Sequence, residues 1–126
     1  MSMAARRPVY LNLFRIRLPL PGVVSIMHRA SGLFLFLILP LLLYLLQLSL
    51  ASPEGYAQVR GWFAQPLAKL GLLLLAWAYL HHFCMGIRHL ALDLDLGVEL
   101  ARARLSAKLV LAVSLSATLL IGVWLW

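Results

Sequence analysis

Five residues recur at helical spacing inside an apolar segment of this chain. Residues 68–93 read AKLGLLLLAWAYLHHFCMGIRHLALD, and a helix there places on one face Tyr79, His82, Gly86, His89 and Asp93. Ionisable side chains in a lipid-facing segment are energetically costly, so they usually face the interior of a helix bundle and have a function. A neutral imidazole at such a position can bond a neighbouring helix, relay a proton or coordinate a metal.

His82 is the residue of this face best placed for coordination. It lies roughly 16 Å along the helix axis from Asp93, and therefore well below the membrane surface. Gly86, one turn further along the same face, would leave room for a flat ring against the backbone. Haem iron accepts a histidine nitrogen as an axial ligand. Because this face offers one deep histidine, a six-coordinate haem would need its second ligand from a partner.

The neighbouring polar residues have simpler interpretations as well. His81 points nearly opposite to His82, together with Arg88, so we expect His81 to contact a neighbouring helix. Arg88 and His89 could meet carboxylate groups at the membrane edge, such as haem propionates, with lipid head groups as the alternative. Asp93 could orient His89 or simply end the helix.

A second polar cluster opens the first apolar segment. The spacing of Ser25, His28, Arg29 and Gly32 places them on one helical face. A quinone headgroup needs hydrogen-bond donors to its carbonyl oxygens at the rim of an apolar pocket, and Ser25 and Arg29 can supply them. The alternative is an ordinary basic helix start near lipid phosphates.

The composition indicates that both clusters belong to an integral membrane protein. Of 126 residues, 63% are hydrophobic and 12% are charged, which is more apolar surface than a soluble domain of this length can bury. Three apolar segments, roughly residues 25–50, 67–92 and 106–126, each exceed the ~20 residues needed to cross the hydrocarbon layer. The sequence therefore predicts an all-α fold with three transmembrane helices. We expect a single membrane-anchor domain over residues 1–126, with a basic arm in residues 1–22.

The net charge of +7 is distributed as in a membrane protein, which argues against a nucleic-acid partner. Nine of the 11 Lys and Arg residues precede or open the first span or surround the loop after the second, and two, Arg60 and Lys69, lie near the other loop. The positive-inside rule then predicts a cytoplasmic N-terminus. Trp124 and Trp126 would anchor the opposite interface. The arm resembles neither a signal peptide nor a transit peptide, which favours a bacterial chain or a mature form. The single cysteine, Cys84, is expected to pack as a small apolar residue.

The motifs SIMHRASG and HFCMGIRHLALD, with RPVYLNLFRIRLP before them and SPEG after the first span, resemble a known family. They closely resemble the cytochrome b membrane-anchor subunit of succinate dehydrogenase, respiratory complex II, over nearly the whole chain. The resemblance implies a multi-pass protein of the bacterial inner membrane that is not catalytic by itself. Its partners would be a flavoprotein subunit with FAD, a subunit with iron–sulfur clusters, and a second hydrophobic anchor subunit. It also implies electron transfer from succinate to ubiquinone, and a haem b shared between the two anchors.

The same resemblance implies roles for particular residues. The haem-ligand histidine of the family stands four residues before the glycine of G-I-R-H, which makes it His82; at the position of His81 a different residue is common. The serine and arginine of the ubiquinone site correspond to Ser25 and Arg29. His28 corresponds to a histidine near a haem propionate, which Arg29 could also contact, and His89 and Asp93 correspond to positions near the same end of the haem.

Two other functions remain open on the sequence alone. One is a haem-free structural anchor of a fumarate reductase or succinate dehydrogenase type of complex, in which the histidines only bridge helices. The other is a small channel or proton-relay protein, which would need polar stripes on every span, whereas the third span has none. Ubiquinone and menaquinone, and either direction of the reaction, are compatible with the motifs.

Overall fold

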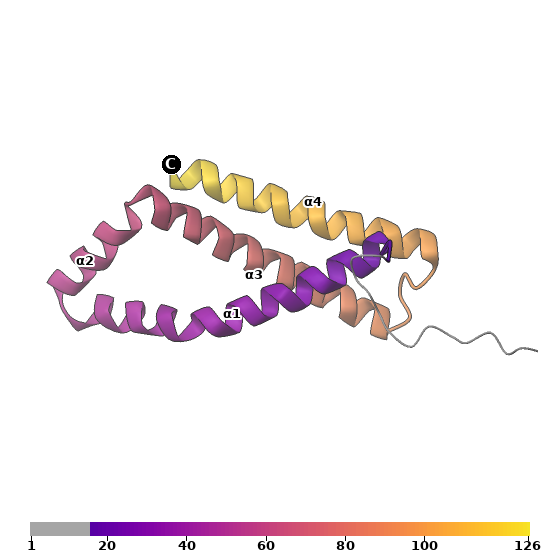
Figure 1. Ribbon diagram of the computed structural model, residues 1–126, viewed down its shortest axis with the longest axis horizontal. Helices are drawn as coiled ribbons and strands as arrows, with labels where there is room; N and C mark the ends of the chain where they lie inside the picture. The colour runs from indigo at the N-terminus through magenta and orange to yellow at the C-terminus, as the bar shows by residue number, and fades with distance from the viewer. Residues whose placement is uncertain (1–15) are drawn as a thin grey trace, which may run out of the picture.

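Four helices form the described part of the chain, residues 16–126, in the computed structural model (Figure 1). They are α1 (Leu20–Ala51), α2 (Pro53–Phe63), α3 (Pro66–Asp93) and α4 (Leu100–Leu125). Three of them, α1, α3 and α4, are long and apolar enough to cross a membrane, and residues 16–126 contain no strand. The predicted all-α fold with three membrane-spanning helices is therefore confirmed.

Two helices begin earlier than the sequence analysis predicted. α1 begins at Leu20, inside the predicted arm, and α4 begins at Leu100 rather than near 106. Pro21 can occupy the first turn of α1, because its fixed φ suits a helix and its missing N–H has no intrahelical partner there. In the first turn of α4, Arg102 pairs with Glu99 across 3.4 Å at the surface, so polar residues extend this helix beyond its apolar stretch. Residues 1–15 of the predicted arm lie outside the described residues.

α2 is a short connecting helix, which the sequence indicated only as a turn or the start of an interfacial helix. The hydroxyl of Ser52 caps it by accepting a hydrogen bond from the N–H of Gly55 at 3.0 Å. Hydrogen bonds from its own backbone N–H and from the Ser52 side chain hold the pKa of Glu54 below its usual value. These local bonds set the start of α2 directly after the end of α1.

Gly55 is buried where α2 contacts α1. Because of this contact, alanine should have different effects on stability at Gly55 and at Gly61 of the same helix. A Cβ at Gly55 would overlap the backbone carbonyl oxygen of Leu48, whereas a Cβ at Gly61 meets no atom within 4 Å. We expect Gly55→Ala to lower the free energy of unfolding by about 1–3 kcal/mol, as overpacking does. Gly61→Ala should be neutral or stabilising, because alanine favours helix. Thermal unfolding of the detergent-solubilised protein tests this, and equal melting temperatures for the two variants would contradict it.

The buried core lies at one end of the bundle, where α1 begins, α3 ends and α4 begins (Figure 1). α3 packs against both α1 and α4, and the core between them consists of Val24, Met85, Ala107 and Val110. Cys84 packs beside this cluster, as expected for a small apolar side chain. Many large apolar side chains along the helices remain exposed, as suits surfaces that contact lipid or other membrane helices.

Two cationic side chains of α3 hydrogen-bond to α4, one near each end of that helix. Arg88 is buried near the start of α4, where its Nε donates to the hydroxyl of Ser106 at 2.9 Å and its Nη2 donates to the carbonyl oxygen of Ala103 at 3.2 Å. At the other end, Lys69 Nζ donates to the carbonyl oxygen of Leu125 at 2.9 Å. Positive charge is favourable at a helix C-terminus, so this second contact also complements the dipole of α4.

Candidate functional site

Three histidines from two helices form one cluster in the bundle. The ring of His28 on α1 stacks on the ring of His82 on α3, with centroids 4.2 Å apart and planes inclined by 16°. The rings of His28 and His89 lie 5.1 Å apart and are tilted by 53°. The structure thus brings together candidate residues from two motifs that are far apart in the sequence.

Hydrogen bonds to α1 fix the orientation of His82. Its Nδ1 lies 3.1 Å from the backbone carbonyl oxygen of His28 and 3.4 Å from the hydroxyl oxygen of Ser31. Because a carbonyl oxygen only accepts, Nδ1 carries the ring hydrogen and Nε2 keeps its lone pair. No hydrogen bond within residues 16–126 involves Nε2. Nε2, with its free lone pair, is the atom of His82 that would coordinate a metal ion.

Gly32 allows the ring of His82 to lie against α1. A Cβ at Gly32 would lie 2.8 Å from Cε1 and 3.2 Å from Nδ1 of His82, so any side chain there would displace the ring. Sequence analysis placed Gly32 on the polar face of α1 but did not identify this contact. A Cβ at Gly86, in contrast, meets nothing within 4 Å. The face of α3 one turn beyond His82 is therefore open, as expected if a flat ring is to lie there.

His81 has an environment opposite to that of its neighbour. It is fully buried, its Nε2 lies 3.4 Å from the carbonyl oxygen of Val24 on α1, and its ring stacks on Trp77 with centroids 5.4 Å apart. Its Nδ1 is enclosed and has no hydrogen-bond partner among residues 16–126. The prediction that His81 contacts a neighbouring helix is confirmed. The two adjacent histidines carry their hydrogens on different ring nitrogens.

Arg88 and Asp93 do not join the histidine cluster. Arg88 is only 8% exposed and hydrogen-bonds to α4 through Nε and Nη2, so it packs between helices and does not meet carboxylates at the membrane edge. The reason is that it lies on the side of α3 that packs against α4, rather than on the side of His82. Asp93 is the exposed last residue of α3, and it makes no ion pair with a histidine in the described part of the chain. Of the two interpretations of Asp93, the structure favours the helix end.

Ser25 and Arg29 lie one helical turn apart near the start of α1, at the same end of the bundle as His89. Ser25 is half-buried and Arg29 is exposed. Neither side chain forms a hydrogen bond with another residue in the range 16–126. A hydroxyl and a guanidinium are thus presented together at the edge of the apolar bundle.

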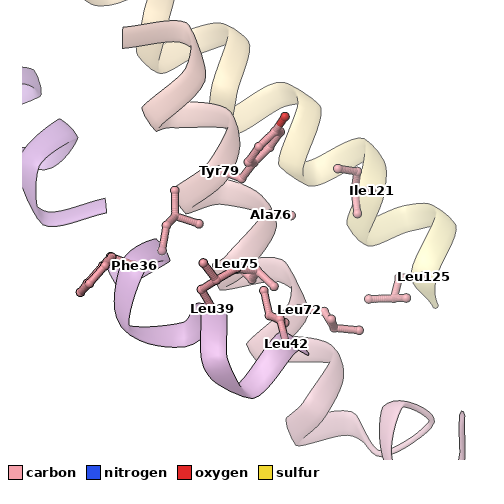
Figure 2. A pocket seen from close by; sticks show the side chains of 10 residues that line it. Phe36, Leu39, Leu42, Leu72, Leu75, Ala76, Tyr79, Ile121 and Leu125 are labelled. Atoms are coloured by element: carbon pink, nitrogen blue, oxygen red, sulfur yellow. The ribbon is translucent and has the colours of Figure 1, made fainter. Parts of the chain in front are cut away.

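An apolar groove of about 750 Å³ opens one helical turn from His82 and is lined by α1, α3 and α4 (Figure 2). Its lining residues are Leu35, Phe36, Leu39, Leu42, Leu72, Leu75, Ala76, Tyr79, Ile121 and Leu125. Tyr79 carries the only polar side-chain group in this lining. A surface of this composition suits an apolar ligand or another membrane helix.

Three apolar helices long enough to cross a membrane, two of which form a histidine cluster, define a multi-pass membrane protein. The chain belongs to the family described as succinate dehydrogenase/fumarate reductase transmembrane subunit, which it matches over residues 3–121. The family indicated by the two motifs is therefore confirmed, and membership of this family argues against the channel alternative.

Several relatives are similar over most of this chain. The succinate dehydrogenase cytochrome b556 subunit of Coxiella burnetii (strain RSA 493 / Nine Mile phase I) is 40% identical over 98% of this chain and 100% of its own length. The protein of the same name from Paracoccus denitrificans is 33% identical over 86% of this chain and 83% of its own. The mitochondrial succinate dehydrogenase cytochrome b560 subunit of Dictyostelium discoideum is 32% identical over 85% of this chain and 56% of its own. The chain is thus a membrane-anchor subunit of the succinate dehydrogenase type, and a bacterial inner-membrane location agrees with its bacterial relatives and its three candidate membrane spans.

Proposed function

We propose that this chain holds one side of a haem b and helps to form the ubiquinone site of a succinate dehydrogenase complex. Nε2 of His82 would bind the haem iron, and the second hydrophobic anchor subunit would provide a further ligand. The observation that carries this proposal is the hydrogen bonding of His82. Its Nδ1–H is taken up by α1, which leaves the Nε2 lone pair for a metal.

The residues around His82 suit a haem. A ligating histidine normally donates its other ring N–H to a carbonyl or carboxylate, as His82 does to His28. His81 is enclosed and turned away, so it does not compete for the iron. The open backbone at Gly86 accommodates a flat macrocycle. A bound haem b carries one electron at a time.

The haem propionates would be bound by groups on the same end of the bundle. His28 and His89 lie together there, and Arg29 adds a permanent positive charge near the start of α1. Charge-assisted hydrogen bonds from such groups to carboxylates are short and strong. We therefore assign His28, Arg29 and His89 to cofactor binding beside the ligand His82.

Ser25 and Arg29 bind the ubiquinone headgroup at the edge of the bundle. The hydroxyl of Ser25 and the N–H groups of Arg29 donate to the quinone carbonyl oxygens. The charge of Arg29 also stabilises the negative charge that develops on those oxygens during reduction.

The basic end of the bundle faces the cytoplasm, in line with the positive-inside rule. The starts of α1 and α4 and the end of α3 meet at that end (Figure 1), so Ser25 and Arg29 open toward the subunits that deliver electrons. Those subunits are the flavoprotein with FAD and the iron–sulfur subunit with its clusters. The second hydrophobic anchor covers the face of His82 within the membrane, and residues 1–126 act as one anchor domain.

A haem-free structural anchor is the competing function, because the stacked His28 and His82 already bridge α1 and α3 without a cofactor. A complex purified through a tag on this chain distinguishes the two functions. We expect the flavoprotein and iron–sulfur subunits to copurify, together with a reduced-minus-oxidised spectrum that shows the Soret and alpha bands of a b-type haem. A complete complex without these bands would establish the structural anchor instead.

Variants at the quinone site test the second half of the proposal. Arg29→Ala should raise the KM for a soluble ubiquinone analogue about tenfold or more, since a hydrogen bond to a charged group contributes roughly 1.5–3 kcal/mol. Ser25→Ala should raise it less, because its hydrogen bond is neutral. Arg104→Ala is the matched control, since Arg104 is exposed on α4 at the same end. Succinate-driven quinone reduction measures these values, and an unchanged KM in Arg29→Ala would reject the assignment.

A further inference from the structure

Ser31 is a buried hydroxyl on α1 within reach of His82. Only 3% of its surface is exposed, and its Oγ lies 3.4 Å from Nδ1 of His82. The same hydroxyl donates a hydrogen bond of 2.9 Å to the carbonyl oxygen of His28. The sequence motif contains Ser31, but the shared polar face predicted there does not include it.

The hydrogen positions around the His82 ring follow from these distances. The hydroxyl hydrogen of Ser31 goes to the His28 carbonyl, which is the shorter of its two contacts. Oγ therefore presents a lone pair to Nδ1, and the His28 carbonyl presents another. Both groups accept from Nδ1–H. The other tautomer would place the lone pair of Nδ1 against two oxygens in an apolar interior, where such an arrangement is costly.

The backbone of α1 bounds the ring on its remaining side. At Gly32, a Cβ would lie 2.8 Å from Cε1 of His82, so the ring fits closely between the Ser31 hydroxyl, the His28 carbonyl and the glycine. The orientation of the imidazole is thus set by α1 in the protein chain alone. Nε2 makes no hydrogen bond within residues 16–126.

We propose that Ser31 is a positioning residue for His82: its hydroxyl keeps the ring in the Nδ1–H tautomer and in the orientation that leaves Nε2 for haem iron. This inference rests on the proposed haem function and adds a residue that acts through the ligand rather than on the iron. Groups that orient ligating histidines typically change metal affinity by about 10–100-fold when removed.

The test compares Ser31→Ala with two other serine variants in the assembled complex. We expect Ser31→Ala to lose haem about tenfold faster to an excess of a haem-accepting apoprotein, and its haem midpoint potential to shift. Ser31→Thr retains the hydroxyl and should behave like the unmodified chain, because a cavity of about 240 Å³ beside Ser31 leaves space for the methyl group. Ser114→Ala is the matched control. Ser114 is also buried and donates to the carbonyl three residues earlier, but its bond of 3.3 Å lies within α4 and does not involve His82.

Each outcome of this comparison distinguishes a positioning role of the Ser31 hydroxyl from a purely structural role of this residue. Faster haem loss in Ser31→Ala alone, with Ser31→Thr and Ser114→Ala unchanged, supports positioning by the hydroxyl. Equal behaviour of Ser31→Ala and Ser114→Ala would overturn it, as would a defect that threonine does not rescue. An unmodified complex that contains no haem would overturn the proposed function instead, so the two failures can be told apart.

Discussion

We expect the replacement of His82 by alanine to abolish the native haem spectrum of the assembled complex, and the replacement of His81 by alanine to preserve it. The two residues are adjacent in sequence, but His82 leaves its Nε2 free while His81 is fully buried and bonded to α1. Loss of His81 should instead lower the melting temperature, because its removal leaves a cavity in the bundle and costs on the order of 2–5 kcal/mol. Reduced-minus-oxidised spectra and thermal unfolding of both complexes measure these opposite effects.

The ring of His28 requires a further control for this experiment. Its centroid lies 4.2 Å from that of His82, so it is close enough to replace the missing ligand in a single variant. The double variant His28→Ala/His82→Ala removes that route, and we expect it to contain no haem. A native spectrum in His82→Ala combined with haem loss in His81→Ala would mean that the ligand has been assigned to the wrong histidine.

Gly86→Leu is expected to exclude haem from the complex without disturbing the packing of this chain. A side chain at Gly86 meets no atom of the described chain within 4 Å, yet it projects one turn from His82 on the face proposed for the macrocycle. Gly71→Leu is the matched control, since Gly71 lies on the same helix and an added Cβ there also meets no atom within 4 Å. The haem content per assembled complex measures the effect.

The comparison also separates haem exclusion from a general defect of α3. If Gly86→Leu and Gly71→Leu assemble with their partners to the same extent, a lower haem content in the first alone identifies a steric block. A normal haem content in Gly86→Leu would show that the macrocycle does not lie over Gly86.

The three long helices and the position of His82 well inside α3 were predictable, because they depend on apolar run length and on helical periodicity within one segment. α2 was predicted only in part, since the segment PEGYAQVRGWF is short and polar and its position depends on Gly55 packing against α1. The burial of Arg88 against α4 was not predictable either. Periodicity shows that Arg88 lies away from His82, but not which helix covers it.

The roles of Gly32 and Ser31 required the relative placement of two helices. Each residue lies in the first motif, and its contact with His82 depends on how far α1 is shifted along α3. The shift of α1 along α3 cannot be obtained from the sequence pattern of either helix. The same is true of the opposite hydrogen positions of His81 and His82, which follow from the particular carbonyl that each ring reaches.

The consecutive histidines of α3 have a consequence for assembly in the membrane. They reach the carbonyl oxygens of Val24 and His28, which are one turn apart on α1. Lipid supplies little hydrophobic force to choose the alignment of two apolar helices, so sliding or rotation of α1 would break both bonds at once. These two hydrogen bonds therefore set the alignment of α1 and α3 in the chain without a cofactor. Haem would then enter a site in which the ring of His82 is already oriented. The conformational entropy of this side chain would be lost during folding, and not during haem binding.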